Sequence, residues 1–577
     1  MINVKENEQL SIMNHSCAHL LAQAVKHLYP NAKFWVGPVV TEGFYYDIDL
    51  GDKVIKEEDL ATIEKEMKKI SKDGKRIVRK EISKQEALDM FKGDEYKIDL
   101  INNMPEGEVI SCYTQGDFTD LCRGPHVESV KELKNFKLLK VSGAYWKGDA
   151  NNKMLQRIYG ICFPTEEELN NHLFMLEEAK KRDHRKIGKE LGLFMISDYG
   201  PGLPFWLPNG YKLRRKLEDF WLKLHAERGY QTIDTPIFLN RELWETSGHW
   251  DHYKEDMYTF DVEDGTYAIK PMNCPGAILV YNNGLHSYKE LPLRYSELGH
   301  VHRYEASGAL SGLFRVRGFT QDDAHILLAE SQIGDEVARI LSLYDYVYSV
   351  FGLNYAIELS TRPEDFMGDI SVWDEAEKAL EKACKATGHD FKINTGDGAF
   401  YGPKLDFKLT DSLGRIWQCG TVQLDMQLPG RFNCTYIAED GSKKTPVMIH
   451  RACFGSLERF IGIITENYAG AFPLWLAPRQ INIIPVNPEI HGEYCHNLCD
   501  RLHSLGFDVE VDDRNEKLGY RMRESQINKI PVTLVIGDNE VANNSVNVRR
   551  FGKEGNETIS YDDFVSSLNK EIESFGK

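Results

Sequence analysis

The alternation of apolar and polar positions separates two segments in the first third of the chain. Residues 1–163 begin with a helical pattern over residues 11–29, and strand-like, turn-rich stretches follow it. Thr165 has Glu168 three residues after it, a capping-box spacing that predicts the start of a helix. The pattern then enters a run of charged residues, so residues 164–186 are predicted to form a linker helix with a solvated end.

The rest of the chain shows two further patterns. Residues 187–477 mix helical stretches with many alternating strands, which predicts an α+β domain built on an antiparallel sheet. From Pro478 onward, apolar strands alternate with helical stretches, which is typical of a small α/β domain with a mostly parallel sheet. We therefore expect a multidomain α+β and α/β protein in which residues 478–577 form the last domain.

Composition agrees with this division and excludes a membrane protein. The chain has 577 residues, enough for three or four domains of roughly 150 residues each. No apolar run approaches the roughly 20 residues of a membrane helix, and the first residues do not resemble a signal peptide. The eleven cysteines are scattered, which favours a reducing, cytoplasmic location. The net charge of −18 argues against nucleic-acid binding over the whole surface, but not against a local basic groove.

Two clusters of reactive side chains lie in the first segment. His15 and His19 are four residues apart, so they share one helix face, nearly opposite the apolar stripe of that helix. They are either two surface histidines or the wall of a polar cleft. Asp120, Cys122 and His126 surround a Gly-Pro turn, which suits a hydrolytic or metal-binding site, or a tight turn with a buried cysteine.

The central segment contains two candidate phosphate-binding features. Residues 295–325 form a strand–loop–strand pattern in which arginines, an aromatic ring, carboxylates and a histidine share one parity. Such a face is either a solvated outer surface or the floor of a polyanion site, because arginine binds phosphate through a planar fork. Further on, a strand turns through Gly455 and Ser456 into a helix with Arg459 in its first turn. This is an ordinary capped helix or a phosphate site at a helix N-terminus.

Basic residues concentrate in the last segment despite the acidic total. They form either a solvated helix face or a contact with RNA. The residues concerned are Arg514, Lys517, Arg521, Arg523, Lys529, Arg549 and Arg550.

These motifs, taken in order, resemble those of class II aminoacyl-tRNA synthetases. The stretches at residues 270–276, 315–325, 398–406 and 446–455 narrow the resemblance to the threonyl family, and it covers essentially the whole chain. His15, His19, Cys122 and His126 resemble the editing domain of threonyl- and alanyl-type synthetases. The resemblance implies a class II antiparallel-sheet catalytic core, an N-terminal α+β editing domain and a C-terminal α/β anticodon-binding domain. It also implies a ligase that joins L-threonine to tRNA(Thr) with ATP and hydrolyses seryl-tRNA(Thr).

The resemblance also assigns roles to residues of the catalytic segment. It implies one Zn²⁺ per subunit on Cys274, His325 and His450. Those implied for ATP, with Mg²⁺ on the phosphates, are Arg303, Glu305, Arg315, Phe319, Gln418 and Arg459. Those implied for threonine are Met272, Asp323, Tyr401 and Gln423. The catalytic residues implied are Arg303, Arg459, Gln321 and Lys404.

Zinc in the catalytic segment would explain an editing domain on the same chain. Valine lacks the hydroxyl of threonine and would leave the zinc under-coordinated, whereas serine lacks only a methyl group, worth about 1–3 kcal/mol. The editing residues implied, in a pocket that works without metal, are His15, His19, Tyr46, Lys97, Asp120, Cys122 and His126. The anticodon-binding residues implied are Asn515, Arg523, Lys529, Glu540 and Arg549. Lys529 replaces a frequent arginine and cannot form its planar fork.

The resemblance also sets expectations for assembly and leaves two alternatives. Residues 227–236 match a segment that builds the class II dimer interface, so a homodimer is expected. The ubiquitin-like domain that begins most family members is expected to be absent, because only fourteen residues precede His15. The alternatives are a class II ligase for serine or proline, and a non-enzymatic tRNA-binding paralogue. The zinc ligands argue against the first alternative, and the ATP-site arginines against the second.

Overall fold

The computed structural model describes residues 3–576 and divides into two compact units, with the division after Glu178. The division falls within helix α5 (Glu166–Arg182), which begins with the predicted capping box: the Thr165 hydroxyl donates to Glu168, and the Glu168 amide donates back to Thr165. The linker helix predicted over residues 164–186 is interrupted at Asp183. The Asp183 carboxylate accepts a hydrogen bond from the Arg185 amide and thereby starts a new helix, α6 (His184–Glu190).

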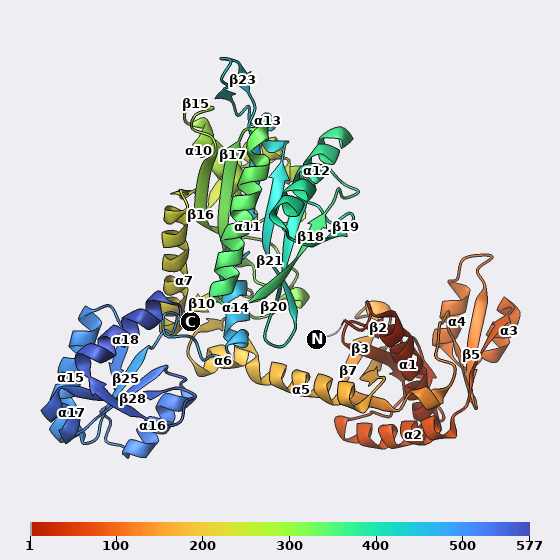
Figure 1. Cartoon of the computed structure of the whole chain (residues 1–577). Coiled ribbons are helices and arrows are strands. Elements are labelled where there is room, and N and C mark those ends of the chain that lie inside the picture. Colours follow the sequence, from red (N-terminus) through yellow and green to blue (C-terminus); the bar gives the residue numbers. More distant parts are fainter. Residues whose placement is uncertain (1–2, 577) are drawn as a thin grey trace. The chain divides into compact units, whose positions relative to one another are not determined.

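The described part of the first unit combines two small sheets with helices α1 to α4 and most of α5. Helices α1 and α2 pack against the first sheet, which has the order β1-β3-β8-β7 with β2 beside β3 (Figure 1). The second sheet has the order β4-β5-β6 and carries α3 and α4. The helices are α1 (Glu8–Leu28), α2 (Leu60–Asp73), α3 (Lys84–Met90) and α4 (Glu95–Asn102), and the strands are β1 (Lys33–Phe34), β2 (Val39–Val40), β3 (Gly43–Asp49), β4 (Ile77–Ile82), β5 (Ile110–Gln115), β6 (Phe118–Leu121), β7 (Asn135–Tyr145) and β8 (Met154–Phe163).

The second unit is built on an eight-stranded sheet of order β11-β16-β17-β24-β21-β20-β18-β19. All pairings are antiparallel except those of the two edge strands, β11 and β19, which agrees with the predicted antiparallel core. The strands are β11 (Gln231–Thr232), β16 (Leu293–His302), β17 (Gly318–Leu328), β18 (Asn354–Ser360), β19 (Phe391–Asn394), β20 (Lys404–Thr410), β21 (Ile416–Asp425) and β24 (Val447–Ala452).

Strand alternation gives this sheet one apolar and one polar face. Ile326, Val422 and Ile449 belong to the main core with residues of α7, α11, α12 and α14, while their neighbours His325 and Gln423 line a cavity on the other face. The helices are α7 (Pro208–Glu227), α8 (Arg241–Ser247), α9 (His249–His252), α10 (Cys274–Asn282), α11 (Ile333–Val350), α12 (Ile370–Thr387), α13 (Leu428–Arg431) and α14 (Leu457–Asn467). Smaller strands are β9 (Phe194–Ile196), β10 (Pro204–Trp206), β12 (Phe238–Asn240), β13 (Thr259–Val262), β14 (Gly265–Ile269), β15 (His286–Ser287), β22 (Tyr436–Ile437) and β23 (Lys443–Lys444).

The C-terminal part has a five-stranded sheet of order β26-β25-β27-β28-β29. The prediction of a mostly parallel sheet was wrong: β25 pairs in parallel with β26 and β27, but β27–β28 and β28–β29 are antiparallel. Only residues 537–544 connect β27 to β28, too few for a parallel crossover, which needs a dozen or more. The strands are β25 (Ile481–Pro485), β26 (Val509–Val511), β27 (Val532–Ile536), β28 (Ser545–Arg550) and β29 (Glu557–Ser560), and the helices are α15 (Pro488–Ser504), α16 (Leu518–Ile527), α17 (Asp538–Asn543) and α18 (Tyr561–Glu573).

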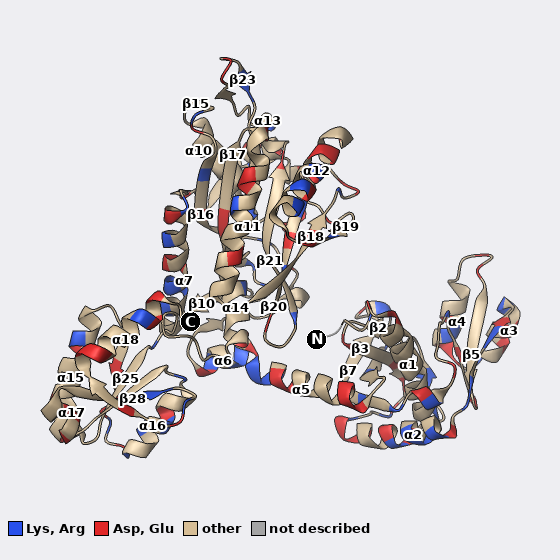
Figure 2. Cartoon of the chain, viewed as in Figure 1, with Lys and Arg blue, Asp and Glu red and all other residues tan. Residues whose placement is uncertain are grey.

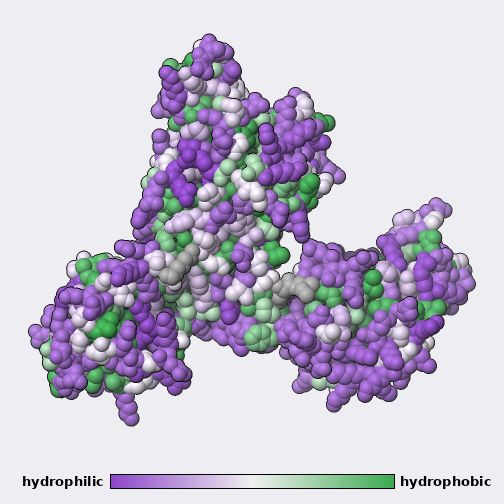
Figure 3. Space-filling model, in the orientation of Figure 1, coloured by the Kyte–Doolittle hydropathy of each residue, from purple (hydrophilic) through white to green (hydrophobic). Residues whose placement is uncertain are grey.

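Charged residues are distributed unevenly along helix α5, and the surface in view is mostly polar. Helix α5 is acidic in its first turn and basic in its last, which complements the helix dipole (Figure 2). The face of the molecule in Figure 3 is mostly hydrophilic, with small scattered apolar patches. Among the described residues, no helix combines the length and apolar character that crossing a membrane requires.

Candidate active sites

A cavity of about 740 Å³ opens on the polar face of the eight-stranded sheet. The structure brings together here all fifteen residues that the sequence placed in the zinc, ATP, threonine and catalytic sets. They are Met272, Cys274, Arg303, Glu305, Arg315, Phe319, Gln321, Asp323, His325, Tyr401, Lys404, Gln418, Gln423, His450 and Arg459.

Cys274, His325 and His450 form a buried cluster in the lining of this cavity. Strand register places His325 directly opposite His450 on β17 and β24, and Cys274 is the first residue of α10. One ligand atom from each lies within 4.8 Å of the other two, and all three residues are buried. The His325 Nδ1 atom is buried without a hydrogen-bond partner. A thiol and two imidazoles in this arrangement match the donor set that zinc prefers.

The surroundings of the three residues orient His450 and suppress the charge of Cys274 and His325. The Asp425 carboxylate lies 2.9 Å from His450 Nε2, so it fixes the orientation of the ring. Burial, with the nearby carboxylates of Asp323 and Asp425, raises the pKa of the Cys274 thiol well above its ordinary value. Burial and the neighbouring His450 lower the pKa of His325 far below its ordinary value. Without a cation, Cys274 is therefore a neutral thiol and His325 a neutral imidazole. A bound metal ion would favour the thiolate of Cys274.

Polar groups beside this cluster converge on a small space. Asp323 is buried and accepts a hydrogen bond from Asn273 at 3.1 Å, while burial raises its pKa. The Tyr401 hydroxyl donates to Gln423 Oε1 at 2.7 Å, and Gln423 is the register partner of His450. A carboxylate, a phenol and an amide thus lie beside Cys274, His325 and His450. These groups can form hydrogen bonds with the polar groups of an amino acid.

The other end of the cavity is rich in arginine. The Arg303 guanidinium lies 5.2 Å from the centre of the Phe319 ring, and its Nε donates to the Pro271 carbonyl. Arg315 forms an ion pair with Glu305 at 2.9 Å. Arginine charges beside a flat ring suit a ligand that combines phosphates with a base.

Helix α14 and strand β20 complete this end. Ser456 caps α14, since its hydroxyl accepts from the Arg459 amide at 3.1 Å, and the Nε of Arg459 has no partner. Lys404 pairs with Asp406 at 3.0 Å, and Gln418 donates to the same carboxylate at 2.7 Å. The helix N-terminus therefore adds its dipole and a fixed charge to the arginine-rich end.

Some residues of the site were not singled out from the sequence. Asn273, Asp406 and Tyr253 also line the cavity, and Asn273 and Asp406 lie inside motifs that drew attention for other residues. His249 is fully buried with its Nε2 3.0 Å from the Met272 sulfur and 3.9 Å from Cys274 Sγ. No local pattern marks His249, because it reaches the cluster from a separate short helix.

The first unit gathers all seven predicted editing residues around α1. Cys122 Sγ lies 3.1 Å from His15 Nε2 and 3.2 Å from His126 Nε2, and the His19 ring lies 4.3 Å from that of His126. Behind them, Asp120 pairs with Lys97 at 2.6 Å and accepts from the Tyr46 hydroxyl. The two histidines of α1 are therefore not both surface residues: His19 is only 3% exposed, and its Nε2 lies 3.8 Å from the Asp120 carboxylate on strand β6.

Burial keeps the histidines and the cysteine of this cluster neutral. It lowers the pKa of His19 to about 3 and also lowers those of His15 and His126. Burial raises the pKa of the Cys122 thiol to about 12. Burial would also raise the pKa of Asp120, but the charge of Lys97 and the hydrogen bonds from Lys97 and Tyr46 hold it below its ordinary value. At neutral pH the cluster thus contains neutral imidazoles, a thiol and one buried ion pair.

The predicted anticodon-binding residues are only partly brought together. Arg523 and Arg549 line one hollow of about 360 Å³ together with Arg550 and Lys553. Lys529 lines a different hollow, where its ammonium donates to the Ala469 carbonyl. Asn515 is exposed after β26 and Glu540 lies in the first turn of α17, and neither lines either hollow.

Comparison with known proteins agrees with these sites. Residues 258–468 match the tRNA synthetase class II core domain (G, H, P, S and T), residues 480–571 match an anticodon binding domain, and residues 110–159 match the threonyl and alanyl tRNA synthetase second additional domain. The sheet, the arginine-rich cavity and these matches define a class II aminoacyl-tRNA synthetase.

Individual relatives narrow the family. The chain is 54% identical to the threonine–tRNA ligases of Clostridioides difficile and Desulforamulus reducens, over 100% of this chain and 90% of each relative. It also resembles the crystal structure of the RNA binding domain of threonyl-tRNA synthetase from Cryptosporidium parvum, with a TM-score of 0.66 and 41% identity, over 67% of this chain and 98% of that one. The chain belongs to the threonyl-tRNA synthetase family.

Proposed function

We propose that this ligase activates L-threonine with ATP in the cavity of the second unit, transfers it to tRNA(Thr), and holds one zinc ion on Cys274, His325 and His450. The observation that carries the zinc proposal is the convergence of three buried donors, with the Nδ1 atom of His325 left without a partner. When bound, zinc supplies a Lewis acid with open positions for the amine and hydroxyl groups of the substrate. Such a site rejects valine but admits serine.

The roles proposed for the other residues follow from charge and position. Asp323 accepts a hydrogen bond from the substrate amino group, with Tyr401, Gln423 and Met272 around the amino acid. Arg303 holds the α-phosphate, Glu305 and Phe319 hold the adenine, and Arg315 and Arg459 hold the outer phosphates, with Mg²⁺. Gln321, Lys404 and Gln418 complete the pocket.

The reaction needs no side-chain nucleophile. The threonine carboxylate attacks the α-phosphate and expels pyrophosphate. The 3′-terminal hydroxyl of the tRNA then attacks the carbonyl of the adenylate and releases AMP. The residues of the cavity position the reactants and stabilise the developing negative charge, which are the main contributions in such transfers.

The zinc proposal is tested with Cys274→Ala. We expect this variant to lose bound zinc and threonine-dependent ATP–pyrophosphate exchange, while the Cys434→Ala variant, which removes another buried cysteine of the same unit, retains both. Zinc is measured by elemental analysis of dialysed protein. A Cys274→Ala protein that lacks zinc but keeps full exchange would refute the proposal.

The first unit is proposed to hydrolyse seryl-tRNA(Thr) by activating water. Because the Cys122 thiol stays protonated, with a pKa of about 12, a thiolate nucleophile is disfavoured at neutral pH. The neutral His15 imidazole, which is partly exposed, is a suitable group to accept the proton from water. The Asp120–Lys97 ion pair, with Tyr46, His19 and His126, positions the ester.

We also propose that the part from Pro478 onward binds the anticodon, mainly through Arg523 and Arg549. The remaining proposals concern assembly: the chain forms a homodimer in the cytoplasm. The exposed side chains of Ile237 and Phe238, which follow the edge strand β11 closely in the sequence, support a subunit interface. Light scattering of the purified protein tests the dimer, and a monomeric mass at micromolar concentration would refute it.

A further inference from the structure

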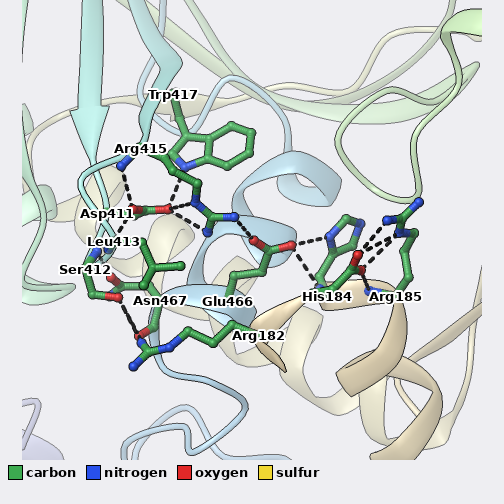
Figure 4. Close-up of polar contacts among 11 residues, drawn as sticks. Arg182, His184, Arg185, Asp411, Ser412, Leu413, Arg415, Trp417, Glu466 and Asn467 are labelled. Carbon is green, nitrogen blue, oxygen red and sulfur yellow. Dashed lines mark hydrogen bonds and ion pairs between the residues drawn. The ribbon is translucent and has the colours of Figure 1, made fainter. Parts of the chain in front are cut away.

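A buried histidine joins the linker to the catalytic unit. His184 is the first residue of α6 and is 2% exposed. The Glu466 carboxylate, near the end of α14, accepts from both the His184 amide at 2.9 Å and the His184 ring nitrogen Nδ1 at 2.7 Å (Figure 4). The side chain is therefore held from one side by a carboxylate in the core.

The other ring nitrogen contacts the loop that leads into the nucleotide end of the cavity. His184 Nε2 accepts a hydrogen bond from the backbone amide of Leu313 at 2.9 Å. A backbone amide can only donate, so Nε2 must be unprotonated and the ring proton must reside on Nδ1, facing Glu466. One tautomer thus satisfies both partners, and it ties α14 to the loop through a single ring.

The loop at residues 312–314 packs closely against His184. Gly312 has a φ of +50°, and a Cβ added there would lie 2.3 Å from His184 Nε2. The Phe314 ring lies 4.1 Å from the His184 ring and 4.4 Å from the Trp417 ring, so it is held between them. Leu313 and Phe314 line the catalytic cavity, and Arg315 follows directly.

Charged groups extend the support beyond the histidine. Arg415 forms ion pairs with Glu466 at 2.6 Å and with Asp411 at 2.7 Å, and Asp411 also accepts from Trp417 Nε1 at 2.9 Å (Figure 4). The chain of contacts therefore runs from α6 through α14 to the turn between β20 and β21. The Trp417 ring then contacts the Phe314 ring, which belongs to the loop that His184 binds.

A metal ion is a weaker explanation of this cluster. Asp183, His184 and Glu466 offer ligand atoms within 4.8 Å of one another. However, the Asp183 carboxylate is bonded to the Arg185 amide and guanidinium, and both ring nitrogens of His184 already have partners. The donors are therefore used within the protein, as in a structural junction.

We propose that His184 is a positioning residue for ATP: it fixes the loop at Leu313 so that Arg315 faces the outer phosphates. The inference rests on the proposed phosphate role of Arg315. It makes the start of α6 part of the support of the nucleotide site, although His184 itself does not line the catalytic cavity.

Two substitutions separate the two hydrogen bonds of the ring. His184→Gln can place an acceptor near the Nε2 position and so preserve the bond to Leu313. His184→Asn can donate to Glu466 but is too short to reach the loop. We expect H184N to raise the KM for ATP in the exchange reaction about three- to tenfold, the range for one lost hydrogen bond, with kcat and the KM for threonine within about twofold. H184Q should restore most of the loss, and His389→Asn elsewhere in the unit should have no effect.

Hydrogen exchange gives a readout that does not depend on activity. The Leu313 amide should exchange faster in H184N than in the parent protein or H184Q. Unchanged exchange at Leu313 together with an unchanged KM for ATP, even with a lower melting temperature, would show a merely structural residue and overturn the inference. Should H184N fail to fold, Gly312→Ala displaces the loop from the intact histidine and must raise the same KM.

An Arg315→Ala variant distinguishes this inference from the proposed function. A raised KM for ATP in R315A with normal behaviour of H184N overturns only the role of His184. An unchanged KM in R315A refutes the phosphate role of Arg315, and with it the purpose proposed for the junction, whatever H184N does.

Discussion

Replacing Asp425 with asparagine tests how the protein orients its proposed zinc ligands. The Asp425 carboxylate is fully buried, accepts from His450 Nε2 at 2.9 Å, and also accepts from the backbone amides of Gln427 and Leu428. Asparagine keeps an oxygen for the backbone amides. Its amide nitrogen would then face a donor on His450, so the ring loses its acceptor and its fixed tautomer.

The expected magnitude follows from this single contact. Loss of a hydrogen-bonded carboxylate behind a metal-bound imidazole typically weakens metal binding about 10–100-fold, which corresponds to roughly 1.4–2.7 kcal/mol. The hydrogen bonds of Asp425 go to His450, Gln427 and Leu428, and none of these residues lies at the nucleotide end of the cavity. The KM for ATP should therefore change less than about twofold. Threonine-dependent exchange should fall in proportion to the zinc lost.

The assay is zinc competition against a chromophoric chelator, followed by exchange kinetics at saturating zinc. Asp440→Asn, on an exposed turn, is the control for the same change of charge. Added zinc should restore much of the activity of D425N, because the ligands themselves are intact. Equal zinc affinity in D425N and the parent protein would refute the idea that Asp425 holds His450 for the metal.

Three further predictions address the other parts of the molecule. His15→Ala should leave threonine charging intact and slow deacylation of seryl-tRNA(Thr) by about 100-fold or more; unchanged deacylation would remove the editing role. Arg523→Ala should weaken tRNA binding by about 1–3 kcal/mol in a filter-binding assay without changing amino-acid activation, and an equal loss of activation would contradict an anticodon role. Burial raises the pKa of Glu458 from 4.5 to about 7, so its contribution to stability is present below about pH 4.5 and is lost as the pH rises through 7. Glu458→Gln should therefore gain in melting temperature relative to the parent between about pH 5 and pH 8, and a constant difference would contradict the burial argument.

Local sequence patterns correctly predicted a helix start and the polar face of one strand. The capping box at Thr165 and the shared parity of Phe319, Gln321, Asp323 and His325 appear in the structure as expected, because both depend only on near neighbours in the chain. The strand parity placed these side chains on one face, where they line the cavity. The predictions that failed concerned how elements connect. The linker helix predicted over residues 164–186 breaks at Asp183, and strands β28 and β29 pair antiparallel rather than parallel.

The sequence by itself determined which face of each element is polar and, through the resemblance of its motifs, the family of the chain. Only the tertiary structure decided which of those faces meet. Cys274, His325 and His450 converge because β17 and β24 pair in one register and α10 begins beside them. Likewise, nothing local joins His184 to Leu313. The physical reason is that periodicity sets the direction of a side chain within its own element, whereas the neighbours of that element are selected by packing and strand pairing over the whole core.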